Sequence, residues 1–438
     1  MLPQRQRLYP DGALAANVLG LVGRDGAGLA GLESAYNTSL AGKNGTLVVE
    51  QDPQGRVIPA AAHREKDPVA GQGLQLTIDR NIQFAAEQAL GAQVKASGAI
   101  KGVAIVMSPQ TGDIYAMAST PGFNPNNPAK ANPADLQNPA VEWAFEPGSV
   151  NKLITLSAAI DRGIVTPTTE VDLPASSPSS GIKGNGFLIH DAENHPAQRA
   201  TVAGVLAKSS NLGTLLISRL LPSRAALEGE LRSFGLGSLT GVGLPGESAG
   251  LLAKSSSWSQ SQAANIPFGQ SMSVTALQVA AAYATIADGG VHVTPRIIEG
   301  TLDGHGTLSR SPAGPARRVV STQTATTMSQ LLEQVTTTNG TAPLASIPGY
   351  RVAGKTGTAA RVDPKTGKYA GYVASFVGFA PADKPSLVVL VSLDNPTSSI
   401  FGGSVAAPTF AKIMSFALAR LRVPPTGTPP VVYPLSVG

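Results

Sequence analysis

Strand-like segments at both ends of one long region constrain the fold most. Residues 102–119, "GVAIVMSPQTGDIYAMAS", hold two apolar runs around a turn and predict a hairpin. Near the other end, 374–381 and 386–396 have the length and apolar content of two buried strands. Helical patterns lie between these ends, such as 273–290, which finishes at a glycine. This order predicts a mixed α/β domain over about 74–423.

Two further helices bound this domain. The segment 79–94 has Asp79 as a candidate N-cap and a shared apolar side formed by Ile82, Ala86, Ala89 and Leu90. The segment 407–421 predicts a closing helix, and the tail 424–438 is rich in Pro and Thr, so we expect it to be loose.

The first 73 residues have a different character. They are rich in Gly and turn signals, and "TLVVE" at 46–50 followed by "DPQG" at 52–55 and "RVIP" predicts a hairpin. The charged, Pro- and Gly-containing stretch 63–73 marks a boundary. We therefore expect 1–73 to be a separate, β-rich unit.

Composition excludes several function classes. The 438 residues include no cysteine, so disulfides, thiolate chemistry and cysteine-ligated zinc are ruled out. The close pair His190 and His195 forms no metal-ligand pattern, and we interpret both as loop residues. The net charge of +5 comes without a Lys/Arg run, which disfavours nucleic acid as the partner. No apolar run reaches the ~18 residues that span a bilayer, and the N-terminus lacks the regions of a signal peptide.

The segment "FEPGSVNKLITLSAAIDRG" at 145–163 is the first candidate for chemistry. Pro147 and Gly148 break the chain and a helical pattern begins, which places Ser149 at a helix start with Lys152 one turn on. A serine hydroxyl needs an adjacent base, and a lysine becomes one when burial lowers its pKa. The alternative is an N-capped surface helix, but the apolar flank "LITLSAAI" predicts burial. Ser180 and Lys183 share the spacing in a segment that cannot hold a helix.

A second candidate is Ser209-Ser210-Asn211 within "TVAGVLAKSSNLGTLLISRL". The flanking segments are apolar and helical, with a polar interruption between them. Capping of a helix break is one interpretation. The other is that Ser209 and Asn211 present a hydroxyl and an amide from a loop between two helices.

The tripeptide Lys-Thr-Gly occurs twice. The copy at Lys355, with Thr356, Gly357 and Thr358, follows a strand-like segment, and its glycines leave room for another backbone. The copy at 365–367 lies in "VDPKTGKY", where Asp-Pro and Gly mark a turn. We predict that the first copy belongs to a site and that the second is a solvated connection between strands.

The order S-x-x-K, S-x-N, K-T-G is that of the penicillin-recognising serine acyl enzymes. With "FEPGSVNK", "KSSN", "AGKTGTA", "LTIDRNIQ" and "GVGLPGES", nearly the whole chain resembles the class B penicillin-binding proteins. "LVVLVSLDNP" and "GGSVAAPTFAKIM" resemble the septal, cell-division type. The resemblance implies an antiparallel sheet flanked by helices, preceded by part of an N-terminal pedestal.

The resemblance also implies roles. Ser149 would be the nucleophile on the D-Ala-D-Ala bond of a peptidoglycan stem peptide and Lys152 its base. Ser209 would relay a proton to the leaving amine, and Asn211 would bind the substrate amide and hold Lys152. Lys355 would supply positive potential. Thr356 and Thr358 would bind the terminal carboxylate beside Gly357, and the N–H groups of Ser149 and Thr358 would form the oxyanion hole. Phe145 stands where we would often expect Tyr.

No cofactor or metal is implied. The implied partners are a donor stem peptide, an acceptor amine, β-lactam antibiotics, and membrane glycosyltransferase and division proteins. The family carries a cytoplasmic tail and one membrane helix before the pedestal, so we expect this chain to begin after them and to lie outside the cytoplasm.

Other activities fit the same motifs. A β-lactamase or β-lactam sensor would share the fold, and a division scaffold would bind partners without catalysis. Class A β-lactamases place a Glu with E-x-x-x-N spacing between S-x-N and K-T-G, and no acid there has Asn four residues later. We interpret Glu228, Glu230 and Glu247 as solvated surface residues.

Overall fold

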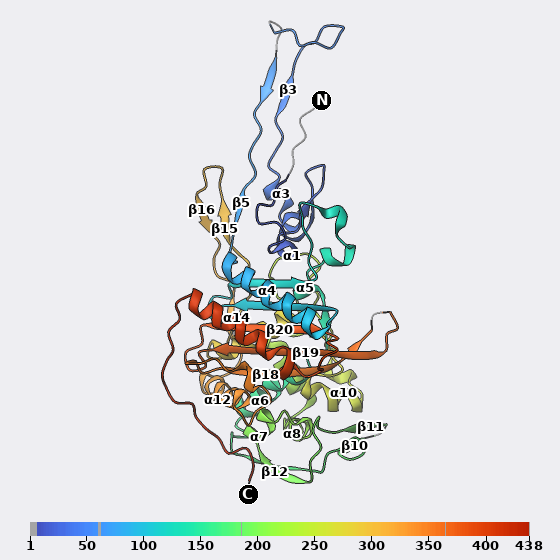
Figure 1. The fold of residues 1–438 in the computed structure, drawn as a ribbon, viewed down its shortest axis with the longest axis vertical. Helices are drawn as coiled ribbons and strands as arrows, with labels where there is room; N and C mark the ends of the chain where they lie inside the picture. The colour runs from blue at the N-terminus through green and yellow to red at the C-terminus, as the bar shows by residue number, and fades with distance from the viewer. Residues whose placement is uncertain (1–6, 60–62, 185, 364, 438) are drawn as a thin grey trace.

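A five-stranded antiparallel sheet forms the centre of the molecule (Figure 1). The computed structural model describes residues 7–59, 63–184, 186–363 and 365–437. The strand order is β18-β19-β20-β6-β7. Their bounds are Ala353–Val362 for β18, Tyr369–Ala380 for β19, Leu387–Asp394 for β20, Lys101–Met107 for β6 and Ile114–Thr120 for β7. The sheet therefore joins segments from the two ends of the region predicted to be one α/β domain.

Both predicted pairs of strands are confirmed. β6 and β7 form the hairpin expected over 102–119, and its turn is closed by a hydrogen bond from Ser108 N to Asp113 O. β20 pairs along its whole length with residues 373–380 of β19. β6 lies beside β20, so the N-terminal hairpin completes a sheet that the C-terminal strands begin.

Helices cover this sheet. The long helices α4 (Arg80–Ser97) and α14 (Ala407–Arg420) contact each other and pack on β7 and β20, respectively. α11 (Ala276–Ala287) packs against β6, β19 and β20. Every residue of β20 is buried, as expected for a strand covered on both faces.

The predicted helix at 79–94 is confirmed as α4. The Asp79 carboxylate accepts hydrogen bonds from Asn81 N and Ile82 N, which satisfies two free donors of the first turn. All four residues of the predicted apolar side are buried.

The remaining helices and strands lie outside this sheet. The other helices are α1 (Ala16–Leu19), α2 (Gly31–Ala35), α3 (Asn37–Leu40), α5 (Pro139–Glu142), α6 (Lys152–Asp161), α7 (Val202–Ala207), α8 (Asn211–Ser218), α9 (Arg224–Ser233), α10 (Gln260–Asn265), α12 (Thr322–Glu333) and α13 (Gly402–Val405). The other strands are β1 (Leu21–Val22), β2 (Gly28–Ala30), β3 (Thr46–Val48), β4 (Arg64–Lys66), β5 (Gly73–Leu76), β8 (Ala144–Phe145), β9 (Glu170–Leu173), β10 (Ile182–Gly184), β11 (Phe187–Ile189), β12 (Gln198–Thr201), β13 (Val274–Thr275), β14 (Val291–Val293), β15 (Ile298–Leu302), β16 (Leu308–Arg310) and β17 (Ala316–Arg318).

The N-terminal hairpin differs in part from the prediction. The turn at 52–55 forms, and Gln51 faces Val57 across it. The strand β3, however, pairs with β4 at 64–66, which the sequence suggested was a boundary. The polar "REK" of β4 gives no apolar alternation from which to predict a strand. In Figure 1 this long hairpin extends away from the sheet.

The expectation of a loose C-terminal tail is wrong. The segment from 424 runs back along the molecule and ends beside β12 and α7 (Figure 1). Thr201 Oγ1 donates to Pro434 O at 2.6 Å, Gln334 Nε2 donates to Val431 O at 2.8 Å, and Tyr433 OH donates to Gln330 at 2.6 Å. Pro-rich chain without local structure can still be held by long-range contacts of this kind.

No helix among the described residues combines the length and apolar character needed to cross a membrane.

Candidate active site

Ser149 lies in a tight turn that leads into a buried helix. Residues Gly148–Asn151 form a 3-10 turn and α6 begins at Lys152, so the α-helix starts one turn later than the sequence suggested. Gly148 adopts φ +56°, a conformation that a glycine reaches without strain. Ser149 is half-buried, whereas most of α6 is buried, so the hydroxyl lies at an accessible edge of the core.

Lys152 is fully buried beneath this turn. Its Nζ donates to Asn211 Oδ1 at 2.8 Å, to Ser209 Oγ at 3.3 Å and to the Ser209 carbonyl oxygen. Burial lowers the pKa of Lys152 to about 7, and the Asp191 carboxylate acts in the opposite direction. A large fraction of this amine is therefore neutral near pH 7 and able to accept a proton.

Ser209 lies in the loop between α7 and α8, as the polar interruption predicted, and Asn211 is the first residue of α8. Ser209 adopts φ +60°, which is uncommon for a residue other than glycine. Such conformations persist only where surrounding contacts hold them, and they cluster at functional sites. Here both lysines of the motifs contact Ser209, which places its hydroxyl between two amines.

Lys355 is the second of these amines. It lies on β18, the edge strand of the central sheet, and is fully buried. Its Nζ donates to Ser209 Oγ at 2.8 Å, Thr356 Oγ1 at 3.1 Å and Thr356 O at 3.3 Å. Burial lowers the pKa of Lys355 well below its usual value, and the nearby Lys152 amine lowers it further.

Glycines allow β18 to approach the turn that holds Ser149. A β-carbon on Gly357 would lie 2.3 Å from Ser375 Oγ and 3.1 Å from Pro147 O. A β-carbon on Gly148 would lie 3.0 Å from the carbonyl oxygen of Thr358. A side chain at either position would therefore collide with neighbouring atoms, which supports the expectation that the glycine of the first Lys-Thr-Gly copy admits another backbone. They also place Thr358 beside the turn of Ser149.

The second Lys-Thr-Gly copy lies in the turn between β18 and β19. Its Lys365, Thr366 and Gly367 are exposed, and Gly367 N donates to Asp363 O at 2.8 Å across the turn. The interpretation of this copy as a solvated connection between strands is confirmed.

Five of the predicted site residues are thus joined by hydrogen bonds: Lys152, Ser209, Asn211, Lys355 and Thr356. Ser149, Gly357 and Thr358 lie beside them through the contact of the turn with β18. Within the described ranges, no group of three or more His, Cys, Asp or Glu side chains could hold a metal ion.

Comparison with known proteins identifies this arrangement. The family model for the penicillin binding protein transpeptidase domain matches residues 102–415, and that for the penicillin-binding protein dimerisation domain matches 1–76. The chain belongs to the penicillin-binding protein transpeptidase family.

Individual relatives agree with the family assignment. Penicillin-binding protein PbpB of Mycolicibacterium smegmatis is 41% identical over 98% of this chain and 67% of its own length. Peptidoglycan D,D-transpeptidase FtsI of Escherichia coli is 33% identical over 96% of this chain and 68% of its own. The crystal structure of penicillin binding protein 3 from Mycobacterium tuberculosis complexed with aztreonam superposes with a TM-score of 0.87 at 39% identity, covering 99% of this chain and 93% of that one. The chain spans about two thirds of the length of the curated relatives. The predicted family and fold are confirmed.

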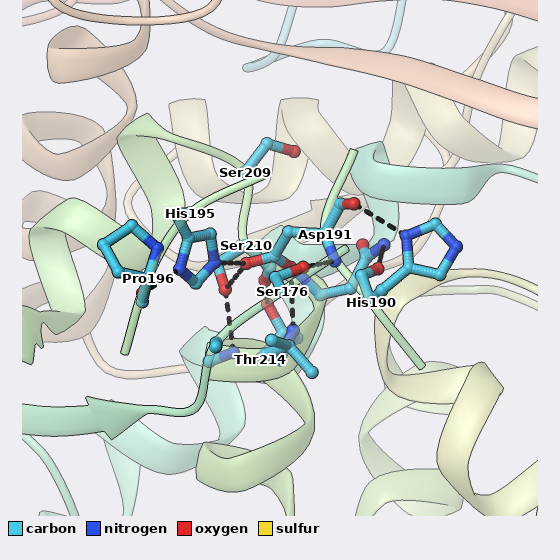
Figure 2. Close-up of polar contacts among 12 residues, drawn as sticks. Ser176, His190, Asp191, His195, Pro196, Ser209, Ser210 and Thr214 are labelled. Carbon is cyan, nitrogen blue, oxygen red and sulfur yellow. Dashed lines mark hydrogen bonds and ion pairs between the residues drawn. The ribbon is translucent and has the colours of Figure 1, made fainter. Parts of the chain in front are cut away.

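Sequence reasoning missed one residue that contacts the candidate site, Asp191. Asp191 and its neighbours lie in the segment that joins β11 to β12, and Figure 2 shows His195 and Ser210 converging on the Asp191 carboxylate. The two histidines do lie in a loop segment, as interpreted, but both contact Asp191. No periodicity or short motif links 191 to the Ser-x-Asn loop about 20 residues later, so only the fold reveals the contact.

Glu228, Glu230 and Glu247 make their polar contacts with residues outside this site. Glu230 is buried, contrary to the expectation of a solvated residue, because its carboxylate pairs with Arg162 at 3.0 Å. The same Arg162 nitrogen donates to Ala158 O at 2.8 Å, so the pair lies beside the last turns of α6, whereas Lys152 is the first residue of that helix. Glu228 pairs with Arg232 and Glu247 accepts from Thr240 N, each a local contact.

Phe145, which stands where Tyr was often expected, is buried against Trp143, with ring centroids 4.7 Å apart.

Proposed function

We propose that this chain is a serine-type peptidoglycan D,D-transpeptidase that cross-links stem peptides through an acyl-enzyme during cell division and is acylated by β-lactams. The observation that carries the proposal is the position of Ser209 Oγ, 3.3 Å from the Lys152 amine and 2.8 Å from the Lys355 amine, beside the turn that holds Ser149. Relatives named as D,D-transpeptidases and β-lactam complexes of a similar protein support it.

Acylation begins with Ser149. Its Oγ attacks the carbonyl carbon between the two D-alanines, and the hydroxyl proton passes to Lys152 Nζ. A fully buried lysine with a pKa of about 7 is suited to this role, because its neutral form is abundant and it can still be protonated. The N–H groups of Ser149 and Thr358 would stabilise the oxyanion that develops.

The proton then reaches the leaving group through Ser209. Its hydroxyl contacts Lys152, so it can pass a proton to the nitrogen of the departing D-alanine as the C–N bond breaks. Asn211 would orient Lys152 and the substrate amide. A second amine attacks the ester, forms the cross-link and releases Ser149.

Lys355 would recognise the substrate's terminal carboxylate together with the hydroxyls of Thr356 and Thr358. A carboxylate at this position would favour the charged form of Lys355 and, by like-charge repulsion, the neutral form of Lys152. β18 is an edge strand, so backbone groups on its outer side can pair with an extended peptide.

The remaining assignments complete this proposal. Residues 1–73 would be part of a pedestal, 74–423 the transpeptidase domain and 424–438 a C-terminal segment. The protein would act outside the cytoplasm, anchored to the membrane by a helix. A membrane glycosyltransferase and other division proteins would be its partners.

Covalent labelling tests the function. The protein should form a stable adduct with a fluorescent penicillin, and Ser149→Ala should form none. Intact-mass spectrometry over hours after a penicillin pulse separates the alternatives: a persistent adduct supports the transpeptidase, rapid return to the unmodified mass supports a β-lactamase, and absence of any adduct supports a non-catalytic scaffold.

A further inference from the structure

Asp191 is a buried carboxylate that accepts four hydrogen bonds. It is 6% exposed. Its Oδ1 accepts from Leu212 N at 3.0 Å and from Asn211 N, and its Oδ2 accepts from Ser210 Oγ at 2.7 Å and His195 Nε2 at 3.0 Å (Figure 2). Both oxygens are therefore fully occupied by donors, which is what a buried charge requires.

Three of the four donors belong to the start of α8. Ser210 is the N-cap of this helix and accepts from Gly213 N while it donates to Asp191. Asp191 takes the N–H groups of the first two helical residues, Asn211 and Leu212. The position of the loop that carries Ser209 and Asn211 is thus fixed by an acid from a distant segment.

The same segment orients the Asn211 side chain. Asn211 Nδ2 donates to His190 O at 3.0 Å, so Oδ1 faces the Lys152 amine at 2.8 Å. Ser209, whose φ of +60° needs support from its surroundings, precedes Ser210 directly. Residues 190 and 191 together hold the two side chains that contact Lys152.

Charge is the second aspect of this contact. Three ionisable side chains surround Asp191 and Lys152. His195 donates from Nε2 to the Asp191 carboxylate, and His190 Nδ1 lies 2.8 Å from the Asp191 carbonyl oxygen. The Lys355 amine contacts the same Ser209 hydroxyl as Lys152 does. His195 Nδ1 faces Pro196 O at 2.7 Å, so both its ring nitrogens face acceptors. Asp191 is the acid that acts on Lys152, and it favours the protonated amine.

We propose that Asp191 is a positioning residue for acylation, which anchors the Ser209–Asn211 loop against Lys152 and sets the pH at which acylation becomes fast. This inference rests on the proposed function. A group that merely held the fold together would affect stability but would not change the pH dependence of the rate.

The test compares wild type with Asp191→Asn by stopped-flow acylation with a fluorescent penicillin from pH 5 to 9. The amide keeps one oxygen for the two backbone donors but loses the charge and the acceptor for Ser210 and His195. The maximal acylation rate should fall by roughly 10 to 10²-fold, as expected for a displaced catalytic group. The pH of half-maximal rate should move down by on the order of one unit, because the charge that favours protonated Lys152 is absent.

Two further variants complete the design. Asp172→Asn is the matched control, because 83% of the Asp172 side chain is accessible on β9, where it pairs with Arg199 of β12; the rate and pH profile of this variant should stay unchanged. Ser210→Ala removes one anchor and keeps the charge, so its rate should fall several-fold with the pH of half-maximal rate unmoved.

The outcomes separate the two proposals. Wild type that forms no adduct contradicts the proposed function. Suppose that wild type reacts and that Asp191→Asn acylates at a rate within about twofold of wild type, with a pH of half-maximal rate within roughly 0.2 units. Then the role of Asp191 is refuted. If Asp191→Asn does not fold, Ser210→Ala decides, and a rate within twofold of wild type refutes the anchoring.

Discussion

The two copies of Lys-Thr-Gly provide a matched comparison of one buried and one exposed lysine in the same pair of strands. We predict that Lys355→Ala slows acylation by a penicillin strongly and that Lys365→Ala leaves it nearly unchanged. Lys355 is fully buried, whereas Lys365 lies exposed in the turn that follows the same strand.

The magnitude follows from the contacts of Lys355. Its loss removes a fully buried amine and leaves Ser209 Oγ with the longer of its two lysine contacts, 3.3 Å in place of 2.8 Å. Removal of one preorganised electrostatic group from an active site costs about 10²–10³ in rate, or about 2.7–4 kcal/mol. An exposed substitution such as Lys365→Ala changes free energies by about 0.5 kcal/mol or less, which is about twofold.

The assay is the pseudo-first-order rate of labelling by a fluorescent penicillin, followed for both variants under the same conditions. Thermal unfolding of each variant establishes that it is folded. Lys355→Met is a second variant, because it keeps the buried apolar stem and removes only the amine. Equal slowing of Lys355→Ala and Lys365→Ala, or a Lys355→Met rate within twofold of wild type, would show that the first copy does not form the site.

Four further outcomes are expected. Ser149→Ala should lose penicillin labelling while its unfolding temperature stays close to that of wild type, because one half-buried hydroxyl contributes little stability; persistent labelling would contradict its role. Acylation should slow about fivefold from pH 7 to pH 6 and about fiftyfold from pH 7 to pH 5, because a base with a pKa of about 7 is neutral above that value and protonated below it; a flat pH profile would exclude Lys152 as the base. Deletion of 424–438 should lower the unfolding temperature by several degrees, since hydrogen bonds of on the order of 1 kcal/mol each hold this segment to α12 and β12, and unchanged melting would contradict that. Glu230→Gln should leave the lifetime of the penicilloyl adduct unchanged by mass spectrometry, because its carboxylate pairs with Arg162 at the far end of α6.

Much of this site was predictable from sequence, for reasons that are local. Ser149 and Lys152 are one turn apart whatever the rest of the chain does, and Pro147-Gly148 breaks the chain before them. The same holds for the capped helix at Asp79 and for the turn that contains Lys365, because turn and cap chemistry act within a few residues.

Two features of the fold depended on contacts between distant parts of the chain. The polar strand 64–66 pairs with 46–48 across a hairpin whose register no local pattern fixes. The tail 424–437 is held by hydrogen bonds to residues about 100 to 230 positions earlier, so its Pro-rich composition predicted the wrong behaviour.

The electrostatics of the site also required the fold. The sequence established which lysines were candidates, but only the packing of α6, the Ser209 loop and edge strand β18 places both amines on one hydroxyl and buries them. Asp191 is the clearest case, because its carboxylate meets α8 only after the intervening β12 and α7 fold back. Local sequence determines which groups a segment can offer, whereas a pKa depends on burial and on charges a few ångströms away, which distant segments supply.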